Sequence, residues 1–202
     1  MELLTQNSKL KNTSKKLGIK VLNFGISAYK TSKGKITCPF AKDCIKFCYA
    51  QKGAYIWSNV APAFEKRYNI TKQDNFIQLI QLELNKKKPN FVRVHDSGDF
   101  YSRQYLQKWL KIANNNKNIN FYAYTNSIQF IKELEKIPNN FDFIFSDSGK
   151  QVNLIDYKKD RYTKIFDTKQ DLKKANFVDA SKIDLLATKF YNKNNKIGLI
   201  KH

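Results

Sequence analysis

Residues 91–126 read FVRVHDSGDFYSRQYLQKWLKIANNNKNINFYAYTN, and the fold class follows from the pattern of this stretch. It opens with an apolar run at residues 91–94 and closes with a second run at 119–124. Between them, Ser102 offers a helix N-cap, and the apolar residues after it recur at helical spacing. Two strands joined by a helix are typical of a β–α–β unit, in which the strands lie parallel.

The same alternation of strand and helix recurs on both sides of this unit. Further apolar runs that indicate strands lie at residues 20–29, 141–145, 162–166 and 197–200. Their repetition predicts an α/β fold, a partial parallel (β/α) barrel of about six strands. No internal linker stands out, so we expect a single α/β domain over residues 1–202, with residues 1–18 as a flexible, polar N-terminal segment.

The chain is strongly basic, with 37 Lys and Arg residues against 17 Asp and Glu and a net charge of +20. Such a surplus usually has an anionic counterpart, and nucleic acid is the predicted macromolecular partner. The basic residues are mainly lysines spread along the whole chain. A lysine-rich, solubilising surface therefore explains the charge equally well, and both interpretations stay open.

The N-terminal residues lack the basic-then-apolar order of a secretory signal. No apolar stretch approaches the about 20 residues that span a bilayer. We therefore expect a cytoplasmic protein with no membrane partner. In that reducing compartment, cysteines are better candidates for metal ligands or catalysts than for disulfides.

Cys38, Cys44 and Cys48 lie on one short segment with the spacing C-x5-C-x3-C, directly after the first predicted strand. Three thiolates on such a segment can converge on one centre, and Lys42 and Lys46 would help to keep them ionised. Grouped cysteines of this kind predict a metal or an iron–sulfur cluster. The alternative is three unreactive buried thiols.

The identity of the centre stays open between two ligand sets. A structural zinc takes four protein ligands, and the chain has no fourth cysteine, so His95 or an Asp would have to complete the site. A [4Fe–4S] cluster held by three cysteines instead leaves one iron open for a small molecule.

Small polar residues follow three successive predicted strands, where a parallel sheet binds its ligands. Gly98 lets backbone approach a ligand, and Asp99 can accept a hydrogen bond from an ammonium or a ribose hydroxyl. The alternative is that these residues are helix caps and turns. The three segments are Ser97-Gly98-Asp99, Thr125-Asn126-Ser127 and Ser146-Asp147-Ser148-Gly149.

Taken together, these segments resemble the radical S-adenosylmethionine superfamily, whose three-cysteine loop after the first strand holds a [4Fe–4S] cluster. That loop is typically C-x3-C-x2-C with an aromatic residue before the last cysteine; Phe47 precedes Cys48 here, and both gaps are longer. Ser97-Gly98-Asp99 resembles the Gly-Gly-Glu element that meets the cofactor's amino group. Thr125-Asn126-Ser127 is similar to the Thr-Asn-Gly at the end of the third strand.

More narrowly, four motifs resemble the phage gene product 88 family, over about residues 20–150. This resemblance implies a phage protein and little chemistry by itself. The motifs are Cys38-Pro39, Cys48-Tyr49-Ala50, Ser97-Gly98-Asp99-Phe100-Tyr101-Ser102 and Tyr122-Ala123-Tyr124-Thr125.

The resemblance to radical enzymes implies that the open iron binds S-adenosylmethionine through its amino and carboxylate groups. An electron donor would reduce the cluster, and one electron would cleave the sulfonium bond to give a 5′-deoxyadenosyl radical. His95 and Asp96 would contact substrate or transfer a proton. The implied residues are the metal ligands Cys38, Cys44 and Cys48, the cofactor-binding Ser97, Gly98, Asp99, Thr125 and Asn126, and the catalytic candidates His95 and Asp96.

The cysteine loop predicts an iron–sulfur protein, and its resemblance to radical S-adenosylmethionine enzymes implies an activity that modifies nucleic acid or nucleotides. The alternative is a zinc- or cluster-stabilised nucleic-acid-binding phage protein without catalysis, in which the cysteine loop is structural. A relative that keeps the fold and has lost activity is a third hypothesis. A thiol nucleophile formed by Cys48 with His95 would leave Cys38 and Cys44 unexplained.

Overall fold

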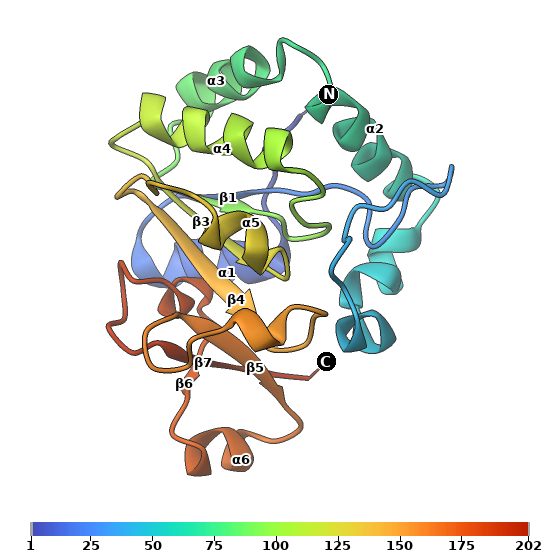
Figure 1. Cartoon of the computed structure of the whole chain (residues 1–202). Helices are drawn as coiled ribbons and strands as arrows, with labels where there is room; N and C mark the ends of the chain where they lie inside the picture. Colours follow the sequence, from blue (N-terminus) through green and yellow to red (C-terminus); the bar gives the residue numbers. More distant parts are fainter. Residues whose placement is uncertain (1, 202) are drawn as a thin grey trace.

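In the computed structural model, which describes residues 2–201, seven strands form one sheet that curls into a half-barrel (Figure 1). The order is β1-β2-β3-β4-β5-β7-β6, and all neighbouring strands pair in parallel. The predicted partial parallel barrel is therefore confirmed. The strands are β1 (Val21–Phe24), β2 (Phe91–Val94), β3 (Asn120–Thr125), β4 (Phe141–Ser146), β5 (Tyr162–Phe166), β6 (Val178–Asp179) and β7 (Lys196–Ile200).

The sheet has one strand more than the about six that the sequence predicts. The additional strand, β6, has two residues, Val178 and Asp179, and so is too short to leave an alternating pattern. β1 ends at Phe24, well before the end of the predicted run at 20–29. After this strand, Ile26 donates its backbone N–H to the Ser97 carbonyl, 2.9 Å away, in the segment that follows β2.

Helices cover the sheet on both sides, so alternate strand residues enter two different cores. Figure 1 shows α3 and α4 side by side on one face and α1 near the other. In β2, for example, Val92 and Val94 pack under α3 and α4, and Phe91 packs with residues of α1. The helices are α1 (Ser8–Leu17), α2 (Ala61–Thr71), α3 (Phe76–Lys87), α4 (Arg103–Asn115), α5 (Ile128–Lys132) and α6 (Lys169–Lys174).

Trp109 of α4 is the largest fully buried side chain in the core between the sheet and helices α3 and α4. Its ring centroid lies 5.2 Å from that of Phe24 and 5.7 Å from that of Phe76, both in edge-on contact. Ser102 caps α4 as predicted, because its Oγ accepts the N–H of Tyr105 at 3.2 Å.

Within the N-terminal segment expected to be flexible, the structure has helix α1. Asn7 caps it by accepting the N–H of Leu10 at 3.0 Å, and Gly18 ends it at φ +65°. Only Leu10 and Thr13 of this helix are buried. The face that packs against the sheet is therefore too narrow to show as an apolar pattern in a mainly polar sequence.

Among the residues described, no helix combines the length and the apolar character that crossing a membrane requires. The single domain and the cytoplasmic location stay predictions.

Candidate functional site

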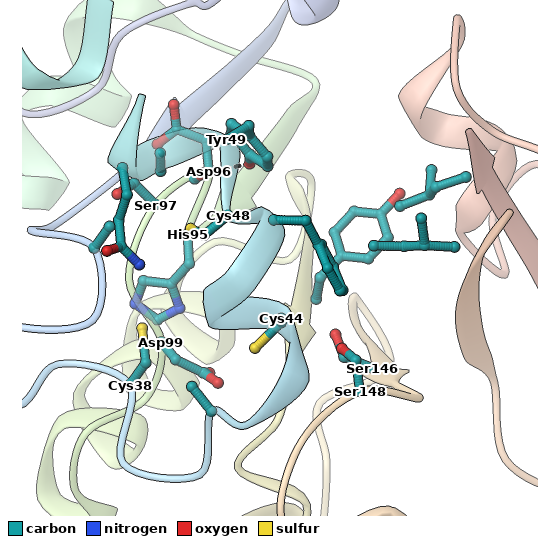
Figure 2. A pocket seen from close by; sticks show the side chains of 18 of the residues that line it. Cys38, Cys44, Cys48, Tyr49, His95, Asp96, Ser97, Asp99, Ser146 and Ser148 are labelled. Carbon is teal, nitrogen blue, oxygen red and sulfur yellow. Dashed lines mark hydrogen bonds between the residues drawn. The ribbon is translucent and has the colours of Figure 1, made fainter. Parts of the chain in front are cut away.

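A cavity of about 440 Å³ lies at the carboxyl ends of the strands (Figure 2). Its size is in the range of small-molecule sites. Polar segments that follow β2, β3 and β4 form one wall, and the segment between β1 and α2, residues 25–60, forms another. We call residues 25–60 the cysteine segment. The predicted location of the site, beyond the ends of parallel strands, coincides with this cavity.

Backbone hydrogen bonds hold the cysteine segment across the strand ends. Asp43 donates its N–H to the Ser148 carbonyl at 3.0 Å, and Lys150 donates to the Phe40 carbonyl at 2.7 Å. Ala41 pairs with Gly149 in an isolated antiparallel bridge. The loop after β4 therefore fixes the stretch that carries the cysteines.

Cys38, Cys44 and Cys48 all line this cavity, and all three thiols are free (Figure 2). Within residues 2–201, no three His, Cys, Asp or Glu side chains stand close enough to hold one metal ion. The cysteines surround a space and do not meet at a point. This arrangement lacks the four converging ligands of a structural zinc, and the iron–sulfur cluster stays a prediction.

Burial raises the pKa values of the Cys38 and Cys44 thiols, and the nearby Asp99 carboxylate adds to the effect. Lys46 pairs with Asp43 at 3.1 Å on an exposed face. For Cys38 and Cys44, the prediction that lysines keep the thiols ionised is therefore wrong, because desolvation outweighs the exposed cations.

The raised pKa predicts slow alkylation of Cys38 in metal-free protein. A Cys44→Ser/Cys48→Ser variant isolates this thiol, and its reaction with iodoacetamide at pH 7.5 is measured by mass spectrometry. We expect a rate at least about tenfold below that of the same variant in denaturing urea, because each unit of pKa rise lowers the thiolate fraction about tenfold. Equal rates would contradict the burial of this thiol.

Asp99 joins the segment after β2 to the segment after β3. Its carboxylate accepts hydrogen bonds from Thr125 Oγ1 at 2.6 Å, the Phe100 N–H at 2.7 Å and the Asn126 N–H at 2.8 Å. Burial raises the pKa of Asp99 to about 6, and these bonds oppose the rise. Asn126 Nδ2 lies 3.7 Å from Cys44 Sγ, so three of the predicted site residues meet beside a cysteine.

Gly98 and Ser97 shape the backbone that carries Asp99. Gly98 has φ +83°, and a Cβ added there would lie 2.2 Å from Ile26 Cγ1. The close approach that glycine permits is therefore to Ile26 of the cysteine segment. Asp99 also donates its N–H to the Thr37 carbonyl at 3.1 Å, one residue before Cys38.

His95 lines the cavity but is only 2% exposed. Burial and the neighbouring Arg93 charge lower its pKa to about 3, so the imidazole is neutral. Its Nε2 lies 2.9 Å from the Tyr105 hydroxyl, and Nδ1 has no partner among residues 2–201. No hydrogen bond joins it to Cys48 in this part of the chain, so the pairing that a Cys48 nucleophile needs is not formed.

Asp96 is buried beside the cysteine segment. Its Oδ2 accepts hydrogen bonds from the Tyr55 hydroxyl at 3.2 Å and from Asn7 Nδ2 at 3.3 Å, and its backbone carbonyl accepts one from the Tyr49 hydroxyl. These contacts fix the carboxylate at the cavity wall and tie the cysteine segment to the start of α1.

Sequence reasoning missed an ion-pair cluster next to this wall. Asp184, which is 0% exposed, contacts Lys9 Nζ at 2.7 Å and Arg93 Nη1 at 3.2 Å, and accepts a hydrogen bond from the Tyr122 hydroxyl at 2.7 Å. The two cations hold the pKa of Asp184 well below its usual range although burial opposes this. The one sign of this cluster in the sequence was Arg93, a charged residue inside the apolar run 91–94.

Comparison with known protein families identifies the family of this chain. The family model described as "Gene product 88" matches residues 1–201. The chain belongs to the Gene product 88 family. The predicted phage protein family is confirmed, and the match extends beyond the 20–150 span of the motifs.

Two relatives of this Gene product 88 chain are the Gene 88 proteins of Mycobacterium phages L5 and D29. Each is 27% identical over 101 residues, which cover 44% of this chain and 42% of the relative. The chain thus matches less than half the length of these curated relatives. No solved structure matches it.

Proposed function

We propose that this protein is an iron–sulfur protein of the radical S-adenosylmethionine type, with Cys38, Cys44 and Cys48 as the ligands of one [4Fe–4S] cluster. One observation carries the proposal: the three cysteines line the same cavity as the segments that follow three neighbouring strands. A cavity of about 440 Å³ offers space for a small molecule beside the cysteines.

The donor chemistry of the site is compatible with such a cluster. Thiols with raised pKa values, as at Cys38 and Cys44, are protonated when free and lose the proton when they ligate a metal. Asn126 beside Cys44 can donate a hydrogen bond to a ligating sulfur. When bound, the cluster supplies the electron that cleaves S-adenosylmethionine; the protein supplies binding, orientation and exclusion of water.

The residues after β2 and β3 would hold S-adenosylmethionine. Ser97, Gly98 and Asp99 would face its methionine end, and Thr125 and Asn126 would orient Asp99 through their hydrogen bonds. His95, held neutral by its surroundings, can accept but not donate a proton at Nδ1 if Nε2 keeps its hydrogen toward Tyr105. An external electron donor and a nucleotide or nucleic-acid substrate complete the proposal.

A second candidate is a zinc- or cluster-stabilised nucleic-acid-binding protein without catalysis. It is favoured by Ile56 and Trp57, which are 61% and 59% exposed on the cysteine segment and follow Lys52 in the sequence. An exposed aromatic side chain beside lysines can stack on a base while the lysine contacts phosphate.

Anaerobic purification with assays of iron, sulfide and zinc separates the two candidates. We expect about four irons and four sulfides per chain in the natural protein, and their loss in the Cys38→Ala/Cys44→Ala/Cys48→Ala variant. A Lys42→Ala/Lys46→Ala variant is the matched control, because it changes the same loop without removing a thiol. S-adenosylmethionine binding is then measured by calorimetry.

One zinc per chain without iron would contradict the radical mechanism and leave the non-catalytic candidate. Iron that persists in the triple cysteine variant would exclude these cysteines as ligands. Near-ultraviolet circular dichroism of each variant confirms that metal loss is not caused by unfolding.

A further inference from the structure

The ion-pair cluster at Asp184 contains two cations for one carboxylate. Lys9 and Arg93 both contact this buried side chain, and both also line the cavity at the strand ends. A buried carboxylate balances one positive charge, so one is left over at the cavity wall.

Two other carboxylates near this wall have partners of their own. Asp96 Oδ2 accepts bonds from Tyr55 and Asn7, and this carboxylate interacts with the Arg67 guanidinium, although its Oδ1 has no hydrogen-bond partner among residues 2–201. Asp179, which acts weakly on Lys9, is half-buried and accepts the N–H of Ser181 at 2.9 Å. Burial lowers the pKa of Lys9 although Asp184 is in contact, as expected for a cation with too little negative charge around it.

The first turn of α1 adds unpaired donors at the same place. Asn7 and Ser8 line the cavity together with Lys9, and the backbone N–H groups of Ser8 and Lys9 have no hydrogen-bond partner in the described chain. This first turn contains no acidic residue. The positive end of the helix dipole therefore acts in the same direction as the two cations.

Arg93 supplies a second and independent sign of a missing ligand. Its side chain is more than nine-tenths buried, and its Nε has no hydrogen-bond partner among residues 2–201. Nη2 donates to the Tyr49 hydroxyl at 3.2 Å, and the guanidinium lies 4.8 Å from the ring centroid of Tyr124. Arg93 thus stands between two aromatic side chains of the cavity, with Nη1 paired to Asp184 and Nε left without a partner among residues 2–201.

We propose that Lys9, Arg93 and the first turn of α1 bind the phosphate group of a small nucleotide, whose base lies along the aromatic side of the cavity. A phosphate offers the negative charge and the several acceptor oxygens that this set of donors lacks. Tyr49 and Tyr124 offer rings for stacking. This deepens the proposed function, on which it rests for the claim that the nucleotide is a substrate.

Calorimetric titration at about 0.15 M salt tests the site, because screening suppresses non-specific binding to the +20 surface. The probes are the four ribonucleoside 5′-monophosphates, their nucleosides and inorganic phosphate. We expect at least one monophosphate to bind about tenfold or more tightly than its nucleoside. Lys9→Gln should weaken that monophosphate about tenfold and leave the nucleoside unchanged, and Lys9→Arg should restore binding.

Lys16→Gln is the matched control, because Lys16 lies exposed at the other end of α1. Equal losses in Lys9→Gln and Lys16→Gln, or no preference of the natural protein for a monophosphate, would overturn the inference. The titration is repeated on the triple cysteine variant. Binding that persists in this variant would show that the site does not need the cluster. Monophosphate binding by a natural protein that carries no iron would support this site while the cluster proposal fails, and iron in a natural protein that binds no monophosphate would mean the reverse.

Discussion

Replacement of Asp184 by alanine is expected to lower the free energy of unfolding by about 3 to 5 kcal/mol. Removal of one partner of a buried ion pair leaves the other charge without compensation, and that cost is of this size. Here Arg93 would keep only its bond to the Tyr49 hydroxyl, and Lys9 would lose its contact at 2.7 Å. Urea denaturation followed by circular dichroism measures the change.

Tyr122→Phe is the control, because it removes one hydrogen bond to Asp184 and leaves both ion pairs in place. Its expected cost is about 1 kcal/mol. Similar costs for Asp184→Ala and Tyr122→Phe would contradict the view that charge compensation is the main contribution of Asp184.

The pH dependence of the Asp184→Ala difference has a definite sign. Folding lowers the pKa of this carboxyl, so its stabilisation is fully present above its unfolded pKa of about 3.9 and is lost as pH falls through the folded value. The difference between the natural protein and Asp184→Ala should therefore be largest near neutral pH and shrink in acid.

The sequence predicted the central strands well because each is a short apolar run between polar turns. The run at 162–166 coincides with β5. The run at 141–145 is one residue short of the end of β4, and the run at 119–124 is displaced from β3 by one residue at both ends. The sequence did not predict β6 or α1, for two different reasons. β6 is too short to show a period, and α1 buries two side chains only.

The site was predictable where residues follow a strand directly. Asp99, Thr125 and Asn126 meet because the carboxyl ends of β2 and β3 are neighbours in a parallel sheet. The pair Arg93–Asp184 was not predictable, since its members are 91 positions apart and belong to no shared motif. The raised thiol pKa values were also hidden, because desolvation depends on the folded surroundings of each sulfur.

Gly98→Ala is expected to cost about 2 to 5 kcal/mol of unfolding free energy, the sum of a strained backbone and an overpacked contact. Alanine would hold φ +83° only with strain, and its Cβ would stand 2.2 Å from Ile26 Cγ1. Because Asp99 follows directly, the shift that relieves this contact would disturb its hydrogen bonds to Thr125 and Asn126.

Gly18→Ala separates the two contributions. Gly18 has φ +65°, and a Cβ added there would meet no atom within 4 Å, so this variant carries backbone strain alone. We expect it to cost about 1 to 2 kcal/mol in urea denaturation, clearly less than Gly98→Ala. Equal costs would mean that Ile26 moves aside freely, in which case the segment after β2 is not held against the cysteine segment by this contact. A larger cost at Gly98 would indicate that the Gly98–Ile26 contact holds the segment after β2 in place against the cysteine segment.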